Sequence, residues 1–257
     1  MKKCIIVYIG NGYSDRVPHY TGQYVYSVDM RDNRQNHFDN IYKPLIDMGY
    51  KVDTVLCTNK HSRYDEFVKE YNALPLVYDD ITREESDFLY QYYAFRIPEQ
   101  WGPGMFSSGA RVLKVQEQID GYDLYIFVRA DSTFKVSLND INVDYRKMNW
   151  LWKETDVRFY NEFREEFLKK FQTEHVFWNS YYRVNGNVLN IIPKKYFRVF
   201  SSYYMYEHLA LGMMIKDLYP IITYEDDVNL ICGEKECFVT DVRVKENPIF
   251  TFNKKIH

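Results

Sequence analysis

The chain has 257 residues, a formal net charge of −3, and 46% hydrophobic against 27% charged residues. This composition is typical of a globular protein of one or two domains, and it excludes the basic footprint of a nucleic-acid-binding protein. No apolar run reaches the length of a membrane span or of a secretory signal, so we expect neither. The four cysteines lack the paired spacing of a zinc site and fit a reducing compartment.

Two apolar runs near the N-terminus predict neighbouring buried strands, Cys4–Ile9 and Val52–Cys57. Between them, Asn40–Met48 carries apolar residues at helical spacing, and Gly49 follows as a C-cap. Residues 17–35 are polar and aromatic without a clear period, which predicts a long loop. A strand–helix–strand unit of this length makes the two strands parallel, with a right-handed crossover and adjacent carboxyl ends.

The residues after these two strands are candidates for a ligand pocket, because ligands of open α/β sheets bind at the carboxyl ends of strands. Glycines allow a ligand to approach the backbone closely. The candidates are Gly10, Asn11, Gly12, Thr58 and Asn59. A dinucleotide fingerprint would need glycine where Asp15 stands, so a Rossmann dehydrogenase is disfavoured. A plain turn is the alternative interpretation of the two glycines.

Further elements follow before the middle of the chain. Ser62–Tyr71 is predicted to be a helix and Leu74–Tyr78 a short third strand. Thr82–Ala94 is predicted to be a helix whose capping box pairs Thr82 with Glu85. A helix capped by Ser107 or Ser108 and ending at Ile119 places Arg111 near its start.

Leu124–Val128 is an unbroken apolar run of strand length, which predicts a strand buried on both faces. It ends in Arg129-Ala130-Asp131, a charged pair at the place where a ligand would bind. The alternative is a strand that exits into solvent with ordinary polar residues, or an ion pair of Arg129 with Asp131 or Asp123.

The helix, the buried strand and the motif Arg129-Ala130-Asp131 together resemble the centre of a GT-A glycosyltransferase, whose strand ends in Asp-x-Asp. The first position departs from that pattern and is closer to the Arg-x-Asp variant of some viral and bacterial glycan-building transferases. The resemblance implies one α/β, Rossmann-like domain over residues 1–257, with a mostly parallel central sheet flanked by helices. Residues 1–135 would bind the nucleotide-sugar, and residues 136–257 would face the acceptor.

The resemblance also implies a nucleotide-sugar donor, most simply UDP-linked, a glycan or glycoconjugate acceptor, and Mn²⁺ or Mg²⁺. Asp131 would be a hard carboxylate ligand of that cation. A single carboxylate binds such an ion weakly, so the donor diphosphate would supply further ligands. Arg129 would orient Asp131 or contact the donor sugar, and Arg111 would meet a donor phosphate.

The second half of the chain is expected to supply the catalytic base. Val188–Ile192 is predicted to be a buried strand closed by Pro193, and Tyr196–Ile215 a helix. Glu207, on that helix, lies where many GT-A enzymes carry their base, and His208 is a candidate metal ligand. Neighbours on a helix point about 100° apart, so the two are not expected to serve one site. The rival acids follow a predicted strand, Ile221–Tyr224, and are Glu225, Asp226 and Asp227.

Two other functions remain open at this point. A nucleotidyltransferase uses a similar sheet, although it ordinarily carries a glycine-rich, basic loop that Gly10–Arg16 resembles poorly. A non-catalytic carbohydrate- or protein-binding module would explain the missing first acid of Asp-x-Asp. For all three functions we expect a cytoplasmic protein, in the host cytoplasm if the source is viral.

Overall fold

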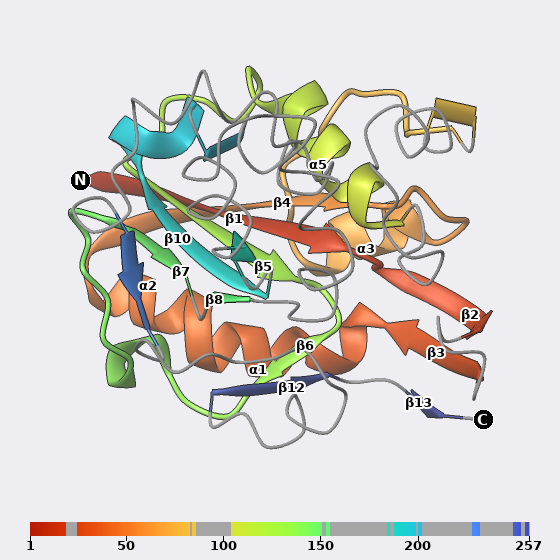
Figure 1. The fold of residues 1–257 in the computed structure, drawn as a ribbon, viewed down its shortest axis with the longest axis horizontal. Coiled ribbons are helices and arrows are strands. Elements are labelled where there is room, and N and C mark those ends of the chain that lie inside the picture. Colours follow the sequence, from red (N-terminus) through yellow and green to blue (C-terminus); the bar gives the residue numbers. More distant parts are fainter. Residues whose placement is uncertain are drawn as a thin grey trace, which may run out of the picture.

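The computed structural model describes residues 1–18, 25–82, 84–85, 104–150, 153–154, 184–185, 188–198, 200–201, 228–231, 249–252 and 255–256. Within them a six-stranded sheet has the order β11-β7-β10-β5-β1-β4 (Figure 1). Its strands are β1 (Lys2–Gly10), β4 (Tyr50–Thr58), β5 (Leu124–Arg129), β7 (Met148–Trp150), β10 (Leu189–Pro193) and β11 (Val228–Leu230).

The central sheet is mostly parallel, as expected for this fold class. β1 pairs in parallel with both β4 and β5, and β7 pairs in parallel with β11. β10 is antiparallel to both of its neighbours, β5 and β7, so it alone among these six strands runs the other way. The structure confirms four predicted strands to within two residues at each end: Cys4–Ile9, Val52–Cys57, Leu124–Val128 and Val188–Ile192.

Continuous apolar sequence explains why β1 and β5 lie in the middle of the sheet. A strand with helices on both faces must be apolar at every position, whereas a half-exposed strand alternates. The side chains from Cys4 to Ile9 and from Leu124 to Val128 are all buried. Alternate residues face two separate clusters, with Ile6 and Ile126 in one, and Val7 and Phe127 in the other.

One helical segment, Met30–Asp47, covers the face of the sheet that contains Ile6 and Ile126 (Figure 1). Helix α5 (Gly104–Val115) covers the opposite face. The segment comprises η1 (Met30–Asn33), α1 (Arg34–His37), the π-helical turn η2 (Phe38–Tyr42) and α2 (Lys43–Asp47). Gly49 follows it with φ at +86°, as a C-cap glycine requires. α3 (Tyr64–Glu70) contributes Phe67 to the same face.

The long loop expected over residues 17–35 is wrong. β2 (Tyr13–Pro18) pairs antiparallel with β3 (Val25–Asp29), and β3 also pairs with β13 (Lys255–Ile256). The helical segment then begins at Met30. The partner of β3 in β13 is more than 200 residues away, so local pattern carries no signal for it. The start of the helix was missed because its inward face is polar, which hides the helical period.

Two other local expectations are corrected. Leu74–Tyr78 is irregular rather than a strand: Leu74 N donates to Thr54 O, while the side chain of Gln118 bonds both backbone groups of Val77. α5 begins at Gly104, so Ser107 and Ser108 lie inside the helix instead of capping it.

The capping box at Thr82 is confirmed. Glu85 N donates to Thr82 Oγ1 at 3.0 Å, and Thr82 N donates to Glu85 Oε2 at 2.8 Å. The rest of that predicted helix lies outside the described residues, as do Ile221–Tyr224 and most of Tyr196–Ile215. The remaining described elements are β6 (Ser132–Phe134) paired with β12 (Phe250–Phe252), β8 (Lys153–Glu154) paired with β9 (Val184–Asn185), η3 (Leu138–Asp140) and η4 (Lys194–Tyr196).

Aromatic rings fill the face of the sheet that α5 covers. The rings of Tyr125 and Phe197 stack with centroids 3.8 Å apart, and Phe127 meets Phe200 at 5.0 Å. Within the part of the chain that is described, none of the helices combines the length and the apolar character that a bilayer crossing needs.

We predict that Phe127→Ala lowers the free energy of unfolding by about 3–5 kcal/mol, because it opens a cavity in the fully buried centre of the sheet. Phe38→Ala is the matched control. The Phe38 side chain is 45% exposed, so its loss should change stability by less than about 1 kcal/mol. Urea unfolding followed by circular dichroism measures both, and equal losses would contradict the assignment of Phe127 to the core.

Candidate active site

The carboxyl ends of β4, β1 and β5 meet at one edge of the sheet. In the strand register Gly10 lies opposite Thr58, and Ile9 lies opposite Arg129. Ala130 N then donates to Ile9 O at 2.9 Å, which ties the turn after β5 to β1. The three segments that the sequence singled out, Gly10–Gly12, Thr58–Asn59 and Arg129–Asp131, therefore lie side by side at this edge.

Arg129 and Asp131 form a two-point ion pair. Arg129 Nε donates to Asp131 Oδ1 at 2.6 Å, and Arg129 Nη2 donates to Oδ2 at 3.1 Å. The Asp131 side chain is 3% exposed and that of Arg129 is 29% exposed. A buried carboxylate without a cationic partner would be very costly, and Arg129 supplies that partner. The ion pair weighed in the sequence analysis is thus present.

Gly10 lies beside the side chain of Arg129. Its φ of +87° lies in the left-handed region, where glycine carries no steric penalty. A Cβ at Gly10 would stand 3.5 Å from Cγ of Arg129. The side chain of Arg129 therefore passes Gly10 at ordinary van der Waals distance, where the ends of β5 and β1 lie side by side.

The turn after β5 is held by three side chains of the Met30–Asp47 segment. Asn33 Nδ2 donates to Ala130 O at 3.1 Å, and its Oδ1 accepts from Thr133 Oγ1 at 2.7 Å. Asn36 bonds both backbone groups of Phe134, each at 2.7 Å. His37 Nε2 lies 2.7 Å from Ser132 O. None of these three residues was singled out from the sequence.

His37 is buried and neutral. Burial lowers its pKa from 6.5 to about 4, more than the bond to Ser132 and the charge of Asp131 raise it. A carbonyl only accepts, so Nε2 carries the ring proton and Nδ1 is a bare acceptor. That Nδ1 is buried and has no hydrogen-bond partner among the described residues. The ring packs against Tyr8 of β1, with centroids 5.2 Å apart, and against Phe134.

The two predicted nucleotide segments bind each other directly. Gly12 N donates to Asn59 Oδ1 at 3.1 Å, and Gly12 O accepts from Met30 N at 2.9 Å. Thr58 is fully buried, and a Cβ at Gly12 would come within 2.9 Å of its Oγ1. The glycine at position 12 is therefore required by close packing, and Asn59 rather than Thr58 lies nearer the surface. Nucleotide contact by these residues stays a prediction.

Arg111 lies in the second half of α5 rather than near the start of its helix. Its side chain is 8% exposed, and Nε donates to Asp80 Oδ1 at 2.5 Å. Burial opposes ionisation of Asp80, but the bonds from Arg111 and from the backbone of Lys60 and Ile81 outweigh it and lower its pKa. Arg111 thus joins α5 to the segment after α3, and its contact with a donor phosphate stays a prediction.

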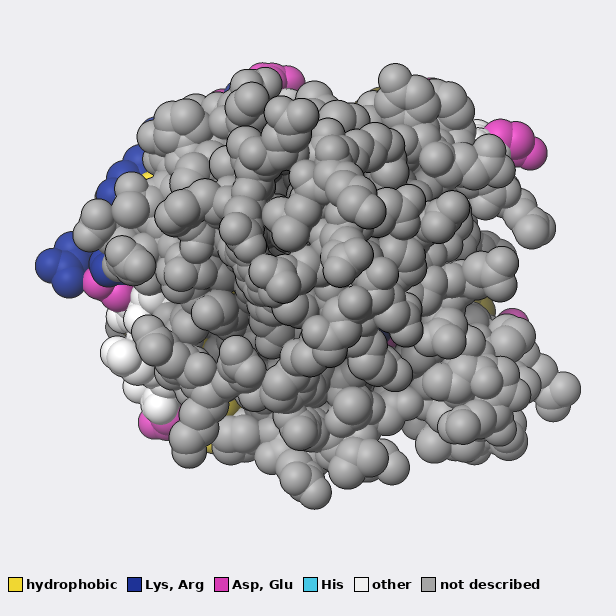
Figure 2. All heavy atoms as spheres, viewed as in Figure 1, with side chains coloured by type: hydrophobic (Ala, Val, Ile, Leu, Met, Phe, Trp, Pro, Cys, Tyr) yellow, Lys and Arg dark blue, Asp and Glu magenta, His cyan; other side chains and the backbone are white. Residues whose placement is uncertain are grey.

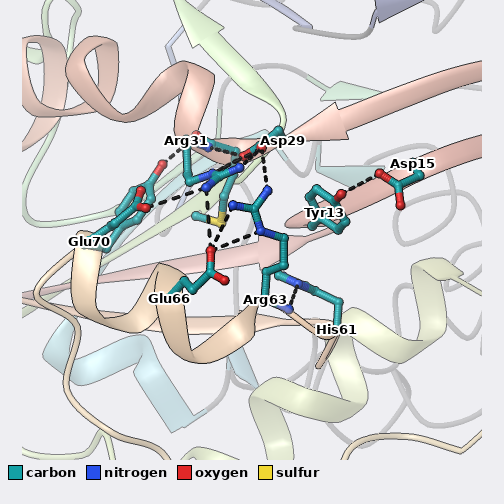
Figure 3. Close-up of polar contacts among 10 residues, drawn as sticks. Tyr13, Asp15, Asp29, Arg31, His61, Arg63, Glu66 and Glu70 are labelled. Atoms are coloured by element: carbon teal, nitrogen blue, oxygen red, sulfur yellow. Dashed lines mark hydrogen bonds and ion pairs between the residues drawn. The ribbon is translucent and has the colours of Figure 1, made fainter.

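A second charged cluster lies beside the Gly12 loop and joins β3, η1 and α3 (Figure 3). Arg31 Nε donates to Asp29 Oδ1 at 2.9 Å, and Arg63 Nη2 lies 2.9 Å from Glu66 Oε2. Arg31 Nη1 also lies 3.8 Å from Glu66 and 3.6 Å from Glu70. Burial raises the pKa of Asp29, but the bonds from Arg31 outweigh this and lower it.

Aromatic residues flank this second cluster. The Arg63 guanidinium lies 5.5 Å from the centroid of the Tyr13 ring, and the Tyr13 and His61 rings are 5.2 Å apart. Arg63 N donates to His61 Nδ1 at 3.2 Å, so the ring proton of His61 is on Nε2. The sequence analysis does not predict this cluster, because it expects a loop where β3 and η1 lie.

The remaining candidates, Glu207, His208, Glu225, Asp226 and Asp227, lie outside the described residues. In the space-filling view, described Lys and Arg side chains gather at the margin where the N-terminus lies, with acidic side chains beside them (Figure 2). That margin has mixed sign and presents no uniform basic surface.

Comparison with known proteins leaves the chain without a family. No family model and no curated protein matches it. A solved structure titled "WbbM bifunctional glycosytransferase apo structure" is similar, with a TM-score of 0.38 and 11% identity, over 89% of this chain and 38% of that one. This chain thus spans well under half of that protein. Likeness at this level transfers no function, so the proposal below rests on the site residues.

We predict that the stability of the protein falls between pH 6.5 and pH 4 in part through His37. The unfolded chain takes up a proton on His37 near pH 6.5, whereas the folded protein resists protonation down to about pH 4. The unfolded state therefore binds more protons in this window, and stability declines with falling pH by up to about 1.4 kcal/mol per pH unit.

His37→Leu tests this origin, since it removes the titrating group. Urea unfolding at pH 7, 6 and 5 should show a smaller acid-induced loss for the variant than for the wild type. His61, whose pKa burial also lowers, contributes equally to both proteins and drops out of the difference. Identical losses in both proteins would assign the pH dependence to other groups.

We predict that Gly12→Ala lowers the free energy of unfolding by about 1–3 kcal/mol, because the new Cβ overlaps Thr58 and approaches Met30 Sδ at 3.2 Å. Thr58→Ala in the same protein should recover part of that loss, since it removes the nearest clashing atom. Chemical denaturation of the two single variants and the double variant measures the coupling. Strict additivity would show that the two residues do not meet.

Proposed function

We propose that this protein is a metal-assisted glycosyltransferase of GT-A type, which moves a sugar from a nucleotide-sugar donor to a hydroxyl of a glycan or glycoconjugate. One observation carries the proposal. A buried carboxylate, Asp131, lies with Arg129 at the carboxyl edge of a mostly parallel sheet, beside a glycine-containing loop. Ligands of open α/β sheets bind at this edge. A UDP-linked sugar is the first donor to test.

Arg129 suits the leaving group of such a reaction. When the acceptor oxygen forms its bond to the anomeric carbon, the bond from that carbon to the diphosphate breaks and the nucleoside diphosphate leaves with the electron pair. A guanidinium is always protonated and has several donors in a planar fork that matches phosphate oxygens. The Arg129 side chain is 29% exposed while it binds Asp131.

A divalent cation would neutralise charge on that diphosphate and polarise it as a Lewis acid. Asp131 is a hard oxygen donor of the kind that Mn²⁺ and Mg²⁺ accept. Both of its oxygens bond to Arg129, and the described residues contain no cluster of three His, Cys, Asp or Glu side chains. A cation at this site would therefore need to receive most of its ligands from the diphosphate.

Glu207 is proposed as the base that takes the proton of the acceptor hydroxyl in an inverting reaction, with His208 as a further candidate ligand of the cation. Both assignments rest on position in the sequence. A positioned general base typically contributes a factor of about 10²–10⁴ in rate. Gly10–Gly12 and Asn59 are proposed to contact the nucleotide, and the acceptor is assigned to residues 136–257.

We predict that Asp131→Asn abolishes the stabilisation of the protein by UDP with Mn²⁺. A ligand at about 100 times its Kd stabilises a protein by about 2.7 kcal/mol, which thermal unfolding detects as a shift of several degrees. Asn keeps one acceptor for Arg129, so the variant should fold. It loses the negative charge and one of the oxygens that a hard cation requires.

Asp29→Asn is the matched control, because Asp29 also forms a two-point ion pair with an arginine two residues away. It should lose stability without losing the response to UDP and Mn²⁺. If Asp131→Asn keeps the full response, Asp131 is only the partner of Arg129. A wild type that responds to nucleoside triphosphates alone would indicate a nucleotidyltransferase, and one that responds to no nucleotide would indicate a binding module.

A further inference from the structure

We propose that Asn33, Asn36 and His37 are positioning residues, which fix the place of the Asp131 carboxylate through the backbone of the turn that carries it. This inference rests on the proposed function. The three side chains come from one helical segment, and all bond to the Ala130–Phe134 segment, which comprises the turn Ala130–Asp131 and strand β6. The hydrogen bonds given above end on the backbone of this segment or on Thr133, and His37 also interacts with the charge of Asp131.

Asn33, Asn36 and His37, which we call the clamp, bond to every residue of the Ala130–Phe134 segment except Asp131. Asn33 bonds Ala130 O and Thr133 Oγ1, His37 bonds Ser132 O, and Asn36 bonds both backbone groups of Phe134. Asp131 is left with its side chain directed to Arg129. The turn is thus fixed on both sides of Asp131 at distances between 2.7 and 3.1 Å.

Folding alone does not require this arrangement. Asn33 and His37 are buried, at 1% and 0% exposure, on a helix face that packs against an apolar sheet. Such a face is ordinarily apolar. His37 also leaves its Nδ1 buried without a partner among the described residues, and an unsatisfied buried acceptor destabilises a protein. We therefore infer that these polar side chains serve to hold the segment to which they bond.

Residues that orient a metal ligand without touching the metal matter nearly as much as the ligand. Loss of such a residue typically weakens metal affinity or activity by about 10–100-fold. Asp131 has one neighbouring cation and one backbone turn to set its position. Displacement of that turn would move the carboxylate relative to Gly10 and Arg129, where the diphosphate is proposed to bind.

The experiment measures the affinity for UDP in the presence of Mn²⁺ by titration calorimetry, together with urea unfolding of each variant. His37→Leu fills the buried position with an apolar side chain but removes the donor to Ser132 O, so the affinity for UDP should fall about 10–100-fold. His37→Gln places an amide donor near the position of Nε2 and should restore most of it. Asn36→Ala, at a partly exposed position, is a second route if His37→Leu does not fold.

Asn149→Leu is the matched control. Asn149 is also fully buried and also clamps backbone, with bonds to Asp144 O, Lys147 O and Ile191 O. It is the middle residue of β7, and two of its bonds are to the loop that precedes this strand. Because β7 runs parallel to β5, that loop is at the opposite edge of the sheet from Asp131. Its loss should lower stability and leave the affinity for UDP unchanged.

The outcomes separate this inference from the proposed function. A fall in affinity for His37→Leu, recovery in His37→Gln and no change in Asn149→Leu would support the clamp. Unchanged affinity in His37→Leu, failure of His37→Gln to recover it, or an equal fall in Asn149→Leu would overturn the clamp while the function stands. Absence of UDP binding in the wild type would overturn the function, and the inference with it.

Discussion

The parallel pairing of β1 with β4 on one side and β5 on the other is the constraint on which the rest of this structure depends. Parallel strands all end at the same edge, so the register that opposes Gly10 to Thr58 and Ile9 to Arg129 brings three distant loops together. The pairing is itself a consequence of burial, because both faces of β1 and β5 are covered and only apolar strands can be covered in this way.

The solvent exposure of each carboxylate near that edge determines how strongly it depends on a neighbouring arginine. Asp131, at 3% side-chain exposure, depends on Arg129, whereas Asp29, at 21%, shares its charge among Arg31, Arg63 and solvent. A two-point bond in a dry environment is strong and directional, and it holds both partners in one orientation. The same bond occupies both carboxylate oxygens of Asp131.

The helical segment Met30–Asp47 has two roles, which require different side chains: packing against the sheet and hydrogen bonding to the Ala130–Phe134 segment. Ile41 and Leu45 pack into the core as an ordinary amphipathic helix does. In the preceding two turns, Asn33, Asn36 and His37 replace apolar contact with hydrogen bonds to the Ala130–Phe134 segment, nearly 100 residues away. The buried Nδ1 of His37 has no hydrogen-bond partner among the described residues, which lowers stability at this position.

The sequence by itself determined the parts of this protein whose cause is local. Apolar runs specify β1, β4, β5 and β10 because complete burial demands them, and the Thr82–Glu85 box is complete within four residues. Only the tertiary structure decided the rest: that β3 pairs with β13, that Arg111 binds Asp80, and that His37 holds Ser132. These depend on partners 31 to more than 200 residues away, and a hydrogen bond between distant residues leaves no period in the sequence of either.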